Sequence, residues 1–166
     1  MSLTKKYLGV SAFAASFAFA GFAQADVCDT PSKLGDMGSF AGDVITIAGS
    51  MEGKDEEMLL NTVNCFEKAT GAVIKYSGSR DFAALIVADL RSNNAPNISI
   101  FPQPGLAGDM AKEGHLVPLG DELASWMTNN YGAGSSWVDL GTYSNAAGKK
   151  DFYGFAYKMD LKSLVW

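Results

Sequence analysis

The stretch from Tyr76 to Leu119 constrains the fold of this chain most strongly. It begins with a polar loop, continues through a short buried strand that ends at Pro102-Gln103-Pro104, and closes with a helix bounded by glycines. This order places hydrogen-bonding side chains at the carboxyl ends of strands, where open α/β sheets bind ligands. The sequence therefore predicts an α/β domain with a ligand site at one edge of its sheet.

The alternation of strand and helix extends back through the chain. Short runs rich in β-branched residues predict three strands, at 44–48, 73–76 and 98–101. Apolar residues at helical spacing predict helices after each strand, from the turn at 49–53 to about Thr70, at 82–92 and at 106–113. Such an order implies right-handed crossovers and a largely parallel, doubly wound sheet.

Two helices have a predicted buried face. The residues expected to point inward are Leu59, Val63, Phe66 and Ala69 in the first helix, and Phe82, Leu85, Ile86 and Leu90 in the second. Beyond His115 the pattern weakens. It predicts a short helix at 123–127, a Gly/Ser/Asn loop at 129–136 and a strand at 153–157.

The first 25 residues predict an export signal. Lys5 and Lys6 precede an uncharged run from 7 to 22, and Ala23-Gln24-Ala25 offers a small-x-small cleavage pattern. That run is shorter than the roughly 20 residues of a membrane span, which disfavours an anchor. Asp26 does not suit a lipoprotein motif before Cys28. We expect cleavage after residue 25 and a soluble periplasmic protein.

Charge and cysteine content narrow the class further. Thirteen basic and 18 acidic residues give a net charge of −5, which argues against a nucleic-acid or anionic-membrane partner. In an oxidising compartment Cys28 and Cys65 are expected to form a disulfide, with two unpaired thiols as the alternative. With one histidine, His115, the sequence offers no zinc pattern, and it contains no GxSxG, HExxH or P-loop motif. No enzyme, metal or cofactor is expected.

Several motifs resemble one protein family. They are Ser79-Arg80-Asp81-Phe82, Pro96-Asn97-Ile98, Phe101-Pro102-Gln103-Pro104-Gly105-Leu106 and Lys162-Ser163-Leu164-Val165-Trp166. After Asp43 the chain closely resembles the amino-terminal lobe of family 1 extracellular solute-binding proteins, which serve carbohydrate ABC importers, nearest to the α-glucoside-binding branch. The resemblance implies a type II periplasmic-binding-protein fold, in which residues 26–157 form the amino-terminal lobe. It also implies that 158–166 begin the crossover to a second lobe that this sequence lacks.

The resemblance and the strand ends together select the candidate ligand residues. They are Glu52, Arg80, Asp81, Gln103, Lys158 and Trp166. A guanidinium donates to sugar hydroxyls, a carboxylate accepts from them, and an amide does both. Structural roles are open alternatives: Arg80-Asp81 as a solvated ion pair with Asp81 as a helix N-cap, Gln103 as part of a rigid turn, and Glu52 as a cap of the first helix.

Sugar rings also need flat apolar surfaces. The later half supplies Trp126, Tyr131, Trp137, Tyr143, Tyr153, Tyr157 and Trp166. Most are expected to be core or hinge residues, and Trp166 is favoured because it lies where the family's chain crosses over. The family often has an aromatic residue after the first strand, where Ser50 and Met51 stand here.

The sequence thus predicts periplasmic binding of an α-glucoside or related oligosaccharide, for delivery to inner-membrane ABC permease subunits, by a protein that is monomeric at full length. This fragment is expected to be incomplete for binding. The alternatives are an exported α/β hydrolase whose catalytic residues lie beyond the fragment, and a binding protein for another solute such as a polyamine or iron.

Overall fold

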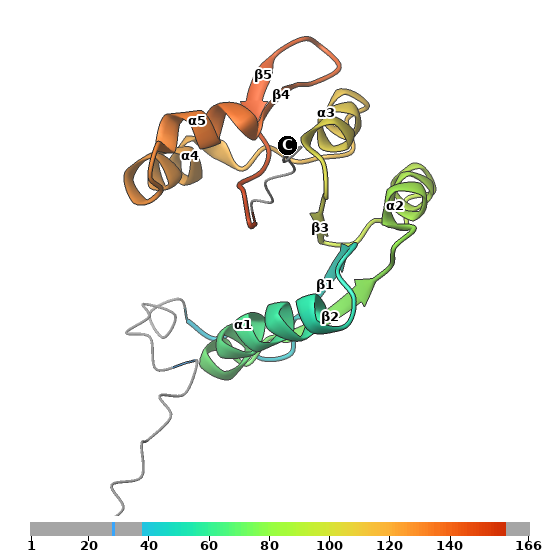
Figure 1. The fold of residues 1–166 in the computed structure, drawn as a ribbon, viewed down its shortest axis with the longest axis vertical. Coiled ribbons are helices and arrows are strands. Elements are labelled where there is room, and N and C mark those ends of the chain that lie inside the picture. The colour runs from blue at the N-terminus through green and yellow to red at the C-terminus, as the bar shows by residue number, and fades with distance from the viewer. Residues whose placement is uncertain (1–27, 29–37, 159–166) are drawn as a thin grey trace, which may run out of the picture.

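The computed structural model describes Cys28 and residues 38–158. The predicted export signal and Trp166 lie outside these residues. Within them, no helix is long and apolar enough to cross a membrane. Along the chain (Figure 1), the elements are β1 (Val44–Gly49), α1 (Lys54–Thr70), β2 (Val73–Gly78), α2 (Phe82–Arg91), β3 (Ile98–Ile100), α3 (Pro104–Lys112), α4 (Gly120–Asn130), α5 (Gly134–Leu140), β4 (Thr142–Ser144) and β5 (Lys150–Phe152).

A parallel three-stranded sheet forms the centre of the fold. Its order is β2-β1-β3, with Val44 opposite Val73 and Gly49 opposite both Gly78 and Ile100. Because the strands are parallel, all three carboxyl ends lie at one edge. The predicted α/β fold with a parallel sheet is confirmed.

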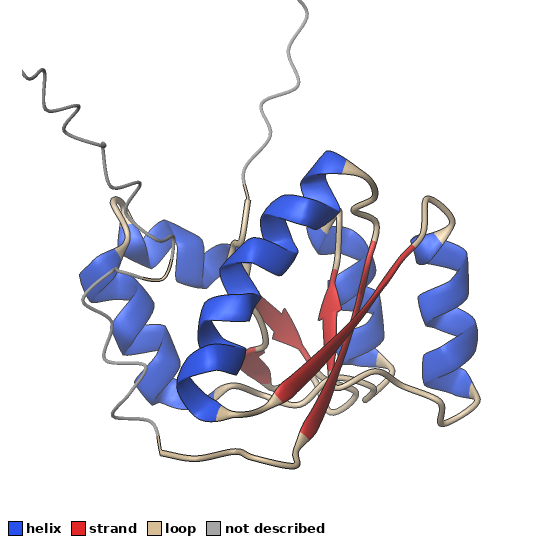
Figure 2. Cartoon of the chain, turned by 90° about the horizontal axis from the view of Figure 1, so that it is seen from below, coloured by secondary structure: helices blue, strands red, loops and turns tan. Residues whose placement is uncertain are grey.

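Helices lie on both sides of the strands (Figure 2). The chain moves from β1 out to β2 through α1, and then back past β1 to β3 through α2. Right-handed crossovers in opposite directions place α1 and α2 on opposite faces. In agreement, Ala48 packs against the α2 core, whereas the neighbouring buried Ile47 points to the other face.

The core on the α2 face consists of one stripe of α2 packed against α3 and the sheet. Its buried residues are Phe82, Ile86, Leu90 and Met110. The ring of Phe82 meets that of Phe101 edge to face, with centroids 5.7 Å apart. The prediction that Leu85 points inward is wrong, because contact is confined to the i, i+4, i+8 stripe and Leu85 lies beside it, 50% exposed.

The first helix also departs from its predicted buried face. Leu59 is buried, whereas Val63 and Phe66 are half-buried and Ala69 is exposed. The helix ends as predicted at Gly71, whose φ of 78° is the left-handed conformation that glycine adopts at low cost.

The last third of the described chain forms a helical pair and a hairpin. The predicted short helix at 123–127 is part of the longer α4, and α5 occupies part of the predicted 129–136 loop. The predicted strand at 153–157 is wrong. The strand is β5, which ends at Phe152 and pairs antiparallel with β4. Beyond it, Gly154 passes so close to Gly141 that a side chain at Gly141 would collide with the Gly154 carbonyl oxygen.

Candidate functional site

The turns that follow β1, β2 and β3 meet at the carboxyl edge of the sheet. They carry Glu52, Arg80-Asp81 and Gln103 respectively. The first two turns are joined directly, because the Ser79 amide donates to the Gly49 carbonyl oxygen at 3.0 Å. The turns after β1 and β2 are therefore in direct contact, and the turn after β3 lies at the same edge of the sheet.

Tyr76 holds the first of these turns. Its hydroxyl accepts a hydrogen bond from the Met51 amide at 3.1 Å and donates one to the Met51 carbonyl oxygen at 2.9 Å. Burial raises the pKa of the Tyr76 phenol, aided by the charges of Glu56 and Glu52 and by Tyr157, while the Met51 hydrogen bond acts in the opposite direction. The phenol is thus neutral at physiological pH and keeps the proton that it donates.

Two glycines make room for this contact. A Cβ on Gly78 would collide with the Met51 carbonyl oxygen, and one on Gly49 would lie 3.0 Å from the Tyr76 hydroxyl and 3.2 Å from the Ile100 Cβ. Sequence reasoning missed both glycines and Tyr76. The one local signal was that β1 and β2 each end at a glycine, in β2 two residues after a tyrosine.

The structure brings Glu52 and Arg80 together. The Arg80 Nε donates to the Glu52 Oε2 at 2.9 Å, and the Arg80 and Glu52 side chains are 88% and 40% exposed respectively. The alternative ion pair between Arg80 and Asp81 is not the one that forms. The bond uses one of the five N–H groups of the guanidinium, so the other donors still face solvent.

Asp81 and Gln103 occupy matching places at the starts of α2 and α3. Both are N-cap residues, and neither side chain makes a capping hydrogen bond. Asp81 therefore occupies the N-cap position that the alternative role as a helix cap requires, but its side chain does not make the capping hydrogen bond. The Asp81 amide instead donates to the Ser79 Oγ at 3.1 Å. Both side chains are exposed, so the carboxylate and the amide are available for other partners.

The last described residues return to this edge. The Tyr131 hydroxyl donates to the Ala156 carbonyl oxygen at 3.2 Å, and the Lys158 Nζ lies 3.5 Å from the Asp55 Oδ2 in the first turn of α1. Lys158 thus lies near the predicted site but pairs with Asp55. Beside it, Tyr157 is 46% exposed and its phenol is close enough to Tyr76 to influence that group's pKa.

The other aromatic residues pack mainly with one another. Tyr131 lies edge-on between Trp126 and Trp137, with ring centroids 6.1 Å and 6.5 Å away. Tyr143 stacks on Tyr153 at 6.4 Å. These contacts agree with the expectation that most of the aromatics are packing residues.

Cys28 and Cys65 form a disulfide, with Cα atoms 5.0 Å apart. The bond attaches Cys28, which precedes β1 in the sequence, to α1. Within the described part of the chain, no cluster of three or more His, Cys, Asp or Glu side chains could hold a metal ion.

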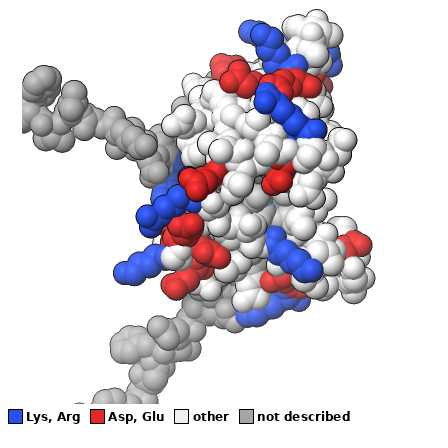
Figure 3. Space-filling view, turned by 90° about the vertical axis from the view of Figure 1, so that its right-hand side faces the viewer, with Lys and Arg blue, Asp and Glu red and all other residues white. Residues whose placement is uncertain are grey.

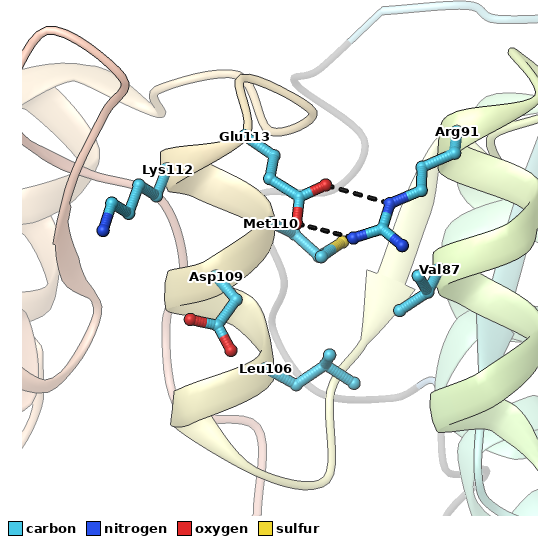
Figure 4. Close-up of a pocket in the computed structure, with 7 residues that line it drawn as sticks. All are labelled: Val87, Arg91, Leu106, Asp109, Met110, Lys112 and Glu113. Atoms are coloured by element: carbon cyan, nitrogen blue, oxygen red, sulfur yellow. Dashed lines mark hydrogen bonds and ion pairs between the residues drawn. The ribbon is translucent and has the colours of Figure 1, made fainter.

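A hollow lies elsewhere, between α2 and α3 (Figure 4). Its volume is about 590 Å³, and its lining consists of Val87, Arg91, Leu106, Asp109, Met110, Lys112 and Glu113. Arg91 already bonds Glu113 through both Nε and Nη2, at 3.0 Å and 2.7 Å. A second hollow of about 390 Å³ lies along α4.

Charged groups of both signs are interspersed over the face shown in Figure 3.

No protein-family model matches the chain. It is 46% identical over 125 residues to the alpha-glucosides-binding periplasmic protein AglE of Rhizobium meliloti (strain 1021), covering 75% of this chain and 27% of that protein. It is 40% identical over 123 residues to the osmoprotective compounds-binding protein GgtB of Synechocystis sp. (strain ATCC 27184 / PCC 6803 / Kazusa), covering 74% of this chain and 28% of that protein.

The chain spans about a quarter of the length of these curated relatives. Both relatives are binding proteins rather than enzymes. The resemblance inferred from the sequence is confirmed: the chain is homologous to a part of solute-binding proteins.

Proposed function

We propose that the chain is the amino-terminal lobe of a periplasmic protein that binds an α-glucoside or related oligosaccharide for import through an ABC permease. The observation that carries this proposal is the convergence of Glu52, Arg80, Asp81 and Gln103 at the carboxyl edge of one parallel sheet. Parallel α/β sheets bind ligands at this edge. The relative that binds alpha-glucosides supports the ligand class.

The groups at the edge suit a neutral, polyhydroxylated ligand. Each sugar hydroxyl both donates and accepts, and the edge offers guanidinium donors from Arg80, carboxylate acceptors from Asp81, and an amide of both kinds from Gln103. Tyr157 provides an exposed aromatic ring nearby against which the C–H face of a sugar ring can stack. Binding requires no covalent step and no cofactor.

We further propose the domain plan read from the sequence. Residues 1–25 direct export and are removed, residues 26–157 form the lobe, and 158–166 lead to a second lobe. The two lobes close around the sugar, and the permease recognises the closed form of a monomeric protein. The proposed two-lobed protein, encoded by the reading frame when it is extended past Trp166, is called the complete protein in the experiments that follow.

A second ligand class follows from the relative that binds osmoprotective compounds. Isothermal titration of the purified complete protein with maltose, an α-glucoside, and with glycine betaine, an osmoprotective solute that is not a sugar, separates the two classes. Saturable binding of a glucoside, with no heat from betaine, is the expected result. Binding of betaine alone would overturn the sugar assignment, and no binding of any solute would overturn the proposed function.

A further inference from the structure

Tyr76 makes an uncommon pair of contacts, because one hydroxyl bonds both the amide and the carbonyl oxygen of the same residue, Met51. The backbone pairing of β1 with β2 stops at Gly49 and Gly78. Met51 lies beyond that point, so the phenol satisfies two main-chain groups after the strand ladder has ended. The side chain thereby fixes the turn that follows β1.

The surroundings are shaped for this contact. Gly78 leaves no space for a side chain beside the Met51 carbonyl oxygen, and Gly49 leaves little beside the phenol. The phenol is half-buried, and burial holds its pKa above the ordinary value. Both hydrogen bonds are therefore made by a neutral hydroxyl in a closely packed place.

Glu52 follows Met51 directly and is the residue that holds Arg80. Both side chains of that ion pair are substantially exposed. An exposed ion pair does little to fix its own geometry, because two long side chains lose conformational entropy when they adopt one arrangement. Its orientation consequently depends on the backbone beneath it, and at Glu52 that backbone is the turn held by Tyr76.

We propose that Tyr76 is a positioning residue for ligand binding: its hydroxyl fixes the Met51 turn, and the turn sets the Glu52–Arg80 pair in the orientation that meets the ligand. Tyr76 itself does not touch the ligand. The claim about ligand binding rests on the proposed function, whereas the claim about the Glu52–Arg80 ion pair does not.

The first test needs no ligand. In the complete protein labelled with ¹⁵N, the Arg80 Nε–H resonance reports the Glu52 contact. The Tyr76→Phe variant should shift this resonance and speed its exchange with water. Tyr143→Phe is the matched control, since burial also raises the pKa of Tyr143 but this residue lies in β4 and stacks on Tyr153. An unchanged Arg80 resonance in Tyr76→Phe would overturn the proposal.

The second test is a double-mutant cycle on sugar affinity. Tyr76→Phe should weaken glucoside binding about tenfold, the effect of one well-placed hydrogen bond. In a Glu52→Ala background it should have little further effect, because that variant offers Arg80 no side-chain acceptor and the pair that Tyr76 positions is already lost. Equal losses in both backgrounds would show a merely structural role and would overturn the proposal. Absence of wild-type binding would overturn the proposed function and leave the Arg80 result as the deciding measurement.

Discussion

Asp81 is the N-cap of α2, but its side chain makes no hydrogen bond to the helix, which separates two roles that this position often combines. Its carboxylate makes no capping hydrogen bond, so a polar but uncharged replacement removes little from the helix. The same carboxylate stands next to Arg80 at the strand-end edge, where a charged acceptor suits a hydroxyl donor.

Asp81→Asn in the complete protein should therefore weaken glucoside binding while leaving the melting temperature nearly unchanged. Loss of a bond to a charged acceptor costs about 1.5–3 kcal/mol. Calorimetric titration beside a thermal melt measures both quantities. Asp109→Asn, an exposed residue of α3 that lines the hollow away from the strand-end edge, is the control and should change neither. Wild-type affinity in Asp81→Asn would remove Asp81 from the site.

Gly78 acts through the space that it leaves. Its backbone does not require glycine, because its φ is not among the positive values, but a Cβ there would collide with the Met51 carbonyl oxygen. Gly78→Ala should cost about 1–3 kcal/mol of unfolding free energy, as overpacking does. Gly105→Ala is the control, since a Cβ there meets nothing within 4 Å. Chemical denaturation of both variants measures this cost. If Gly78→Ala is as stable as Gly105→Ala, the Met51 turn can shift to accommodate the added Cβ.

At the scale of elements, α1 is attached to the chain that precedes β1. The Cys28–Cys65 disulfide should form after periplasmic expression. Intact mass before and after reduction with alkylation tests this, and two thiols that alkylate without reduction would contradict it. Replacing both cysteines with serine should lower the unfolding free energy by about 4 kcal/mol on the chain-entropy account for this loop.

The contact between α2 and α3 should depend on pH through Glu113. The hydrogen bonds from Arg91 lower the pKa of the Glu113 carboxyl, and His115 adds a smaller effect in the same direction. A carboxyl whose folded-state pKa is lowered stabilises the fold above its unfolded-state pKa and loses that contribution as the pH falls through the folded-state value.

Glu113→Gln should accordingly be less stable than wild type near neutral pH, and the difference should vanish in acid. Urea denaturation across this range measures the difference. Glu122→Gln, in the exposed first turn of α4, is the control and should show no such trend. A difference that persists unchanged in strong acid would contradict the ion-pair explanation.

The first three strand–helix units were predictable because each strand is a compact β-branched run and each helix has a regular apolar stripe. The later elements were not, because β4 (Thr-Tyr-Ser) and β5 (Lys-Asp-Phe) lack the β-branched apolar run that marks the equally short β3, and the seven residues of α5 are too few for a helical period to show. At the site, sequence alone placed Glu52, Arg80, Asp81 and Gln103 at strand ends. It did not show the Glu52–Arg80 bond or the Tyr76 contact, because both join residues more than 20 positions apart.

At the scale of the whole molecule, the candidate edge is an open surface, and the hollow between α2 and α3 and the hollow along α4 both lie away from it. Binding sites for small molecules bury most of the ligand. A protein of residues 26–166 should therefore bind glucosides far more weakly than the complete protein. Calorimetry on monodisperse samples of both tests this, and equal affinities would contradict a site shared between two lobes.

The bond from the Tyr131 hydroxyl to the Ala156 carbonyl oxygen has an optical consequence. Tyr131 lies between Trp126 and Trp137. Ala156 belongs to the segment that leads to Lys158, which in turn lies near Asp55 at the start of α1. A shift of that segment pulls on a ring that lies against both indoles. Trp166 is the third tryptophan of the sequence. When it is replaced by phenylalanine, the fluorescence of the remaining two tryptophans reports whether that segment moves when sugar is added.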